Sequence, residues 1–170
     1  PTAETQRFIF DVTESIDTRY GTIDSHSSLT NISTALRNEY NYSASTPYND
    51  DMTTVLSEIN ARRPVIMEGK SELWNYTSAW IVSGANSVYS SSEYQLVVPV
   101  LDYTDEDPYR VVDTHDTQSF SLHLVYVNWG IYGRYDGYYL YDNITQNEGS
   151  PFEVDFNSNR KILTGIYPNN

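Results

Sequence analysis

Arg62-Arg63-Pro64-Val65-Ile66-Met67-Glu68 divides the chain into a helical part and a part that is rich in strands. Before this stretch, apolar residues recur at helical spacing, which predicts a helix that begins after Asp50 or Asp51. The apolar stripe of this helix, which we expect to lie in the core, consists of Met52, Val55, Leu56 and Ile59. The two arginines suit the negative C-terminal end of the helix, and Pro64 prevents it from continuing.

Another helix is predicted further upstream, and one N-terminal run is ambiguous. Apolar residues at helical spacing follow Ser27 and Ser28, whose hydroxyls can cap the free N–H groups of a first turn. These apolar residues are Leu29, Ile32, Leu36 and Tyr40. Residues 7–12, in contrast, fit either a strand or the end of a helix.

The rest of the chain alternates apolar runs with turn residues, which predicts strands. The predicted strands are residues 65–68, 79–82, 95–101, 119–129, 138–141 and 161–166. In residues 119–129, large side chains at every second position predict one strongly buried face, made of Phe120, Leu122, Leu124 and Tyr126. Helices first and strands afterwards predict an α+β fold, with two or so N-terminal helices packed on a mostly antiparallel, twisted β-sheet.

Composition and charge narrow the classes of function. A chain of 170 residues can bury one ordinary hydrophobic core, so we expect a single domain. Hydrophobic residues make up 39%, which is typical of a folded chain, and the 16 tyrosines favour strands. The net charge of -13, with Lys and Arg scattered along the chain, disfavours binding to nucleic acid.

The chain contains no cysteine, which excludes thiol chemistry and thiolate metal sites from these residues. No apolar run approaches the roughly 20 residues needed to cross a bilayer. Residues 1–6 lack the basic start and the apolar stretch of a signal peptide. If the protein is exported, we expect that its signal has been removed.

The most distinctive motif is Val127-Asn128-Trp129-Gly130-Ile131-Tyr132-Gly133, followed by Asp136-Gly137-Tyr138-Tyr139. It resembles the Asn-Trp-Gly-Trp-Gly-Gly and Asp-Gly-Phe/Tyr-Phe signature of the streptopain family, the C10 family of bacterial cysteine peptidases in the papain-like clan. Four further stretches resemble this family in the family's own order, residues 11–21, 35–42, 63–69 and 163–168. The resemblance implies a papain-like fold in a single streptopain-like domain over residues 1–170.

Three departures from the family pattern bear on function. Ser78-Ala79-Trp80-Ile81-Val82-Ser83-Gly84 aligns with a motif that begins with the general-base histidine, so Ser78 stands in place of that base. The family's nucleophilic cysteine lies on a helix before the matched region, and we expect this chain to lack that helix. An insertion at about residues 86–119 replaces the short hairpin typical of the family.

The resemblance gives Asn128 the role of orienting the general base. It gives Trp129 the role of shielding the contact between Asn128 and that base from water. Papain-type cleavage needs a thiolate that an adjacent imidazolium activates. A serine hydroxyl at position 78 cannot accept and return a proton near neutral pH. We therefore hypothesise a catalytically inactive homologue without a cofactor, which acts as a binding or structural module in a secreted or surface-attached bacterial protein.

Two alternatives stay open. The chain could be the C-terminal portion of an active streptopain-like cysteine endopeptidase whose nucleophile lies on a missing N-terminal segment. It could instead be an unrelated β-rich adhesin or glycan-binding module. For the inactive homologue we expect a protein or peptide partner. We also expect that an upstream domain or a second chain completes the fold.

Other polar and aromatic residues have structural interpretations beside functional ones. Trp129 can fill core volume, and Asn128 can satisfy backbone groups in a turn. Exposed aromatic side chains can bind peptide or sugar, and the candidates are Trp80, Tyr132 and Tyr135. None of the three histidines, His26, His115 and His123, aligns with a catalytic position. The acidic run 102–107 lacks the spacing of a calcium loop, so we expect a solvated loop and no metal site.

Overall fold

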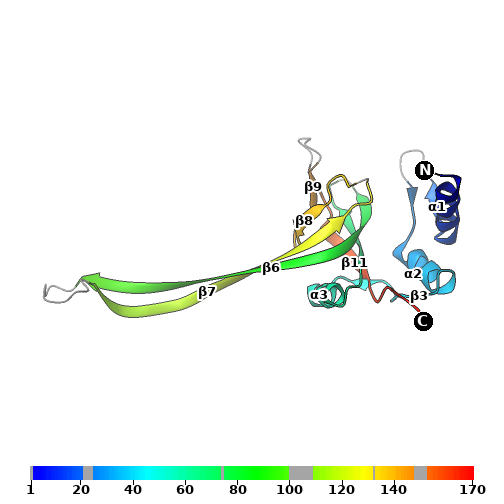
Figure 1. The fold of residues 1–170 in the computed structure, drawn as a ribbon. Coiled ribbons are helices and arrows are strands. Elements are labelled where there is room, and N and C mark those ends of the chain that lie inside the picture. The colour runs from blue at the N-terminus through cyan, green and yellow to red at the C-terminus, as the bar shows by residue number, and fades with distance from the viewer. Residues whose placement is uncertain (1, 21–24, 74, 100–108, 132, 148–152) are drawn as a thin grey trace. The chain divides into compact units, whose positions relative to one another are not determined.

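The computed structural model describes residues 2–20, 25–73, 75–99, 109–131, 133–147 and 153–170. Within these residues the fold is α+β, as predicted, with three helices and mostly antiparallel strands (Figure 1). The helices are α1 (Ala3–Ser15), α2 (Leu29–Asn38) and α3 (Met52–Asn60). Residues 7–12, which the sequence left ambiguous, belong to α1.

Side-chain caps begin all three helices, because each first turn leaves N–H groups without helical partners. The Asp51 carboxylate accepts the Thr54 N–H at 2.8 Å, and the Ser28 hydroxyl accepts the Asn31 N–H at 3.1 Å. Both caps were predicted. The hydrogen bonds from Thr54 lower the pKa of Asp51 below its ordinary value. Thr2 caps α1 in the same way.

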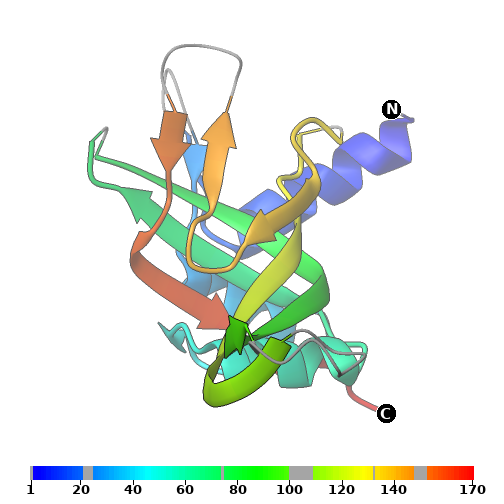
Figure 2. The same ribbon diagram turned by 90° about the vertical axis from the view of Figure 1, so that its left-hand side faces the viewer.

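Six strands form the main sheet in the order β4-β11-β5-β6-β7-β8, seen from two directions in Figures 1 and 2. Their bounds are β4 (Tyr48–Asn49), β5 (Val65–Ser71), β6 (Tyr76–Pro99), β7 (Tyr109–Asn128), β8 (Gly137–Leu140) and β11 (Ser158–Leu163). The strands predicted at 79–82 and 95–101 are therefore parts of one strand as far as Pro99, and the strand predicted to reach residue 166 ends at Leu163.

Three two-stranded sheets complete the secondary structure of the described residues. They pair β1 (Arg19–Tyr20) with β2 (Ser25–His26), β3 (Tyr42–Ser43) with β12 (Tyr167–Pro168), and β9 (Thr145–Asn147) with β10 (Glu153–Asp155).

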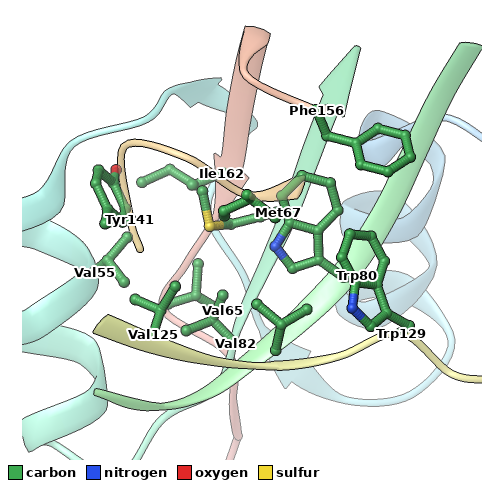
Figure 3. Packing of buried hydrophobic residues seen from close by; sticks show 12 residues of the cluster. Val55, Val65, Met67, Trp80, Val82, Val125, Trp129, Tyr141, Phe156 and Ile162 are labelled. Atoms are coloured by element: carbon green, nitrogen blue, oxygen red, sulfur yellow. The ribbon is translucent and has the colours of Figure 1, made fainter. Parts of the chain in front are cut away.

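The larger hydrophobic core lies on the face of the sheet that α3 covers. Alternate residues of β5, Val65 and Met67, are fully buried there with Val55 of α3. Figure 3 shows Trp80, Trp129 and Phe156 side by side in this core, with the two tryptophan ring centroids 5.1 Å apart. Rings at such distances add about 0.5–1.5 kcal/mol per pair to the stability that comes from burial.

A smaller cluster packs on the opposite face of β5 and β11. Ile66 and Leu163 alternate with residues of the larger core and contact Ile32 and Leu36 of α2. The helices α3 and α2 therefore cover opposite faces of the same two strands. This arrangement agrees with the predicted packing of helices on a sheet.

Two partly buried groups of polar contacts connect residues in and just before α3 to later parts of the chain. Glu58 of α3 accepts two hydrogen bonds from Arg63, both at 2.8 Å, and the Gly165 N–H at 2.9 Å. The bond from Arg63 contributes most to a Glu58 pKa below its ordinary value. In the second group, Asp50 accepts the Tyr141 hydroxyl at 2.8 Å, and burial together with this bond raises the pKa of Tyr141.

The chain divides into two compact units, Pro1–Asn86 with Leu124–Asn170, and Ser87–His123. The second unit consists of the later part of β6 and the earlier part of β7, and it includes most of the expected insertion. The acidic run 102–107 lies outside the described residues.

The predicted buried face of β7 is wrong. Val125 and Val127 are fully buried in the core of the first unit, whereas Leu124 and Tyr126 point to the other face and are half-buried. Phe120 and Leu122 belong to the second unit, where their side chains are 56% and 43% exposed. Side chains of β7 do alternate between two faces as predicted, but the face with the larger side chains is not the one that packs in the core.

Candidate functional site

Ser78 lies near the start of β6, directly opposite Gly69 of β5. Because strand residues alternate, Ser78 shares a face with Tyr76 and Trp80. The Tyr76 and Trp80 rings both approach Phe156, with centroids 6.1 and 5.8 Å away. The aromatic core therefore fixes the strand on both sides of Ser78, whose own side chain is half-buried.

Gly69 allows this close packing because it has no side chain. A Cβ at this position would lie 2.2 Å from the Phe156 carbonyl oxygen and 2.8 Å from the Trp80 ring. The backbone just before β11 therefore approaches β5 more closely than it could if position 69 held any residue other than glycine. The sequence carries a glycine here because the strand that pairs with Ser78 has backbone packed against it.

Ser78 lines a cavity of about 690 Å³ in the first unit. Five consecutive residues, 75–79, form one wall, and Glu68 of β5 lies beside them. The remaining lining residues lie between the end of α1 and the first turn of α2, and they are Ile16, Thr18, His26, Ser27, Ser28 and Ile32. Its size is within the range of small-molecule and peptide sites.

Hydrogen bonds connect the end of α1 to the start of α2 in the cavity wall. The Ile16 carbonyl accepts the Ser27 hydroxyl and the Asn31 side-chain amide, the latter at 3.2 Å. The Thr18 hydroxyl is buried and has no hydrogen-bond partner among the described residues. A buried hydroxyl without a partner costs free energy, so a polar ligand group in the cavity would be favourable at this point.

The structure separates the three histidines. His26, on β2, lines the cavity that contains Ser78. His123 lies in the second unit, where its Nδ1 is 3.0 Å from the Ser87 hydroxyl. His115 lies on β7. His26 is therefore the one imidazole among the described residues that line the cavity.

Asn128 and Trp129 have partners in the turn after β7. The Asn128 side-chain oxygen accepts the Gly130 N–H at 2.8 Å, and Gly130 has a φ of +72°. The Trp129 N–H donates to Asp136 at 2.9 Å, while its ring is 7% exposed in the core. Among the described residues that line the cavity, neither Asn128 nor Trp129 occurs.

The three aromatic candidates for binding lie in different surroundings. Trp80 is 2% exposed, so its ring offers almost no surface to a ligand in this structure. Tyr135 is half-buried with a φ of +65°, and its carbonyl accepts the Tyr139 hydroxyl. Tyr132 lies outside the described residues.

Several cavity residues were not found from the sequence. Glu68, Thr77 and Thr18 line the cavity, but each looks like an ordinary strand or loop residue in the sequence. Glu68 could have been noticed, since it lies opposite Ala79 in a stretch that resembles a family motif. The positions of Thr18 and His26 depend on long-range packing that no local pattern reveals.

The described residues contain no group of three or more His, Asp or Glu side chains arranged to hold a metal ion. In the same part of the chain, no helix has the length and apolar character needed to cross a membrane.

The chain was compared with models of known protein families and with curated proteins. The sequence model of the Peptidase C10 family matches residues 3–139, which include α1, α2, α3 and the Ser78 strand. No curated protein matches the chain.

Proposed function

We propose, because this chain belongs to the peptidase C10 family, that it is a catalytically inactive member that binds a peptide or protein segment without cleaving it. The observation that carries this proposal is Ser78, which stands in the cavity wall at the position where the resemblance places the base.

The chemistry of the position explains the expected loss of activity. A serine hydroxyl does not ionise near neutral pH, so it neither takes a proton from a thiol nor forms the imidazolium that stabilises a thiolate. General-base assistance is worth about 10²- to 10⁴-fold in rate. Asn128, whose side chain accepts a hydrogen bond from Gly130, fits a structural role in the turn.

The cavity suits a segment with both apolar and polar groups. Ile16 and Ile32 supply apolar surface, while Thr18 and Glu68 supply a hydroxyl and a carboxylate. Extended peptides present alternating side chains and backbone groups to such a surface. We therefore assign the cavity to a peptide or protein segment and to no cofactor.

The family match supports a proposal for the setting of the protein. We propose a secreted or surface-attached bacterial protein, in which this chain acts as a binding or structural module. We also propose that an upstream domain or a second chain completes the fold, and that residues 1–170 form a single streptopain-like domain with an insertion near residues 86–119. Family membership removes the support for an unrelated adhesin.

One observation favours the peptidase alternative. His26 lines the same cavity as Ser78, so an imidazole is present there although it comes from a different strand. In that case a cysteine from another segment would supply the nucleophile, and His26 would serve as its base.

A cleavage assay with casein and short peptides, with and without a thiol reductant, tests the proposal. We expect no products from the chain alone or from its His26→Ala variant. Reproducible cleavage by the chain would refute inactivity, and loss of that cleavage in His26→Ala would show that this imidazole takes part in it. A Thr53→Ala variant, on the exposed side of α3, is the matched control for a non-specific effect of substitution.

A further inference from the structure

The unit Ser87–His123 is a ribbon of two strands, and each strand has one open edge. β5 pairs with β6 only from Tyr76 to Val82, and β8 pairs with β7 only from Leu124 to Val127. Among the described residues of the ribbon, each strand therefore has a single strand neighbour. Alternate N–H and C=O groups on the outer side of β6 are left without a strand partner there.

The part of the edge at residues 87–92 lacks the usual protection against pairing. Natural edge strands carry charged residues, proline or bulges that prevent another strand from adding. Residues 87–92 of β6 read Ser-Val-Tyr-Ser-Ser-Ser, and residues 119–123 of β7 read Ser-Phe-Ser-Leu-His. Neither stretch contains Lys, Arg, Asp, Glu or Pro, although the whole chain has a net charge of -13.

The side chains of the ribbon are also incompletely packed. Tyr89 is 74% exposed and Phe120 56%, while Val88 and Leu122 are each 43% exposed. A hollow of about 390 Å³ lies in the ribbon and is lined by Tyr89, Ser90, Ser91, Ser119, Phe120 and Ser121. Large apolar side chains beside an unprotected edge indicate a surface that another chain covers.

We infer that a second copy of this chain pairs with the ribbon, through antiparallel addition of β6 to β6 along residues 87–92. An isolated two-stranded ribbon is marginally stable, and pairing two ribbons gives a sheet of four strands. Such pairing is isologous, so each residue meets a residue of the same stretch, and an uncharged stretch meets itself without repulsion. This inference does not depend on the proposed function of the cavity.

The net charge of the chain provides a signature of this dimer. Two copies with a charge of -13 each repel one another at low ionic strength, and salt screens this repulsion. Association should therefore strengthen as salt is added. Pairing with a basic partner would instead weaken under the same change.

Sedimentation velocity tests the inference on the whole chain. From about 5 to about 200 µM we expect a shift from the monomer mass of 19.5 kDa to twice that mass. The dissociation constant should be lower in about 0.5 M salt than in about 0.05 M salt. Val88→Glu places a charge in the otherwise uncharged edge of each copy, which is how natural edge strands prevent pairing, and it should raise the dissociation constant at least about tenfold. Hydrogen exchange should slow at alternate amides of residues 87–92 in the dimer.

Leu73→Glu is the matched control, because it adds the same charge at a 76% exposed residue of the first unit. It should change the dissociation constant by less than about twofold. Circular dichroism and thermal unfolding establish that both variants are folded. A chain that stays monomeric at high salt overturns the inference. So does equal weakening by both variants, or exchange protection confined to other residues.

Discussion

Replacing Gly69 with alanine tests the packing that positions the Ser78 strand. Gly69 is the cross-strand partner of Ser78, and an added Cβ would lie 2.2 Å from the Phe156 carbonyl oxygen. That oxygen belongs to the backbone, so no rotamer change can move it away. The same Cβ would lie 2.8 Å from the Trp80 ring, which is itself enclosed by the core.

The expected loss of stability follows from these distances. Overpacking a core typically costs 1–3 kcal/mol, and a backbone contact puts Gly69→Ala at the upper end, about 3 kcal/mol. In a chain of this size, each kcal/mol lowers the melting temperature by about 2–4 °C, so we expect a decrease of roughly 6–12 °C. The change should also displace Ser78, since Gly69 and Ser78 pair directly.

Thermal unfolding followed by circular dichroism measures this decrease. Gly137→Ala is the matched control, because a Cβ at Gly137 would meet no atom within 4 Å. The control should change the melting temperature by less than about 2 °C. If the two variants unfold at the same temperature, the close approach of Phe156 to Gly69 is incorrect and so is this account of the Ser78 strand.

Two further predictions concern α3. Glu58→Gln removes the charge that accepts two bonds from Arg63 and one from Gly165, and should lower the melting temperature at pH 7 by about 4 °C. The folded pKa of Glu58 lies below its ordinary value of 4.5, so the stability that its charge contributes is present above pH 4.5 and is lost as the pH falls through the folded pKa. The melting temperatures of the original chain and of Glu58→Gln should therefore converge in acid. A constant difference across this range would contradict the assignment. Asp51→Ala should shorten α3 and lower the helical signal in circular dichroism, because the Thr54 N–H loses its acceptor. Asp51→Asn should retain the cap. Equal effects of the two substitutions would exclude a capping role.

The sequence predicted those elements whose stabilising residues are close together in the chain. The periodic apolar stripe and the Asp51 cap define α3, and Pro64 separates it from β5, as the structure confirms. α1 was ambiguous because its apolar residues include the consecutive run Phe8-Ile9-Phe10, which fits a strand as well as a helix. Short strands such as β3 and β12 were missed, because two residues form no pattern.

Burial along β7 could not be predicted from hydrophobicity alone. Leu122 and Val125 are both apolar, but Leu122 belongs to a ribbon of two strands and Val125 to a layered core. The layer that covers a strand is decided by residues distant in sequence. The family match, in contrast, confirms the resemblance that was derived from motifs in several separate stretches.

Of the residues that line the cavity, the sequence pointed only to Ser78 as part of a functional site. A resemblance identified this position, and the structure places it in a cavity wall together with His26 and Thr18. Those two residues come from loops and short strands whose contacts with residues 75–79 are long-range. The roles given to Asn128 and Trp129 remain predictions, and their contacts are those of a turn and of the core.

Binding without cleavage is the central claim, and one measurement addresses it directly. A fluorescein-labelled casein digest is titrated with the chain while polarisation is recorded, and the same samples are analysed by mass spectrometry. We predict saturable binding that Ala79→Phe, which fills the cavity, weakens and that Ala61→Phe, at the exposed end of α3, does not. Peptide masses should stay unchanged throughout. Shortened peptides, or binding that is indifferent to Ala79→Phe, would contradict the account.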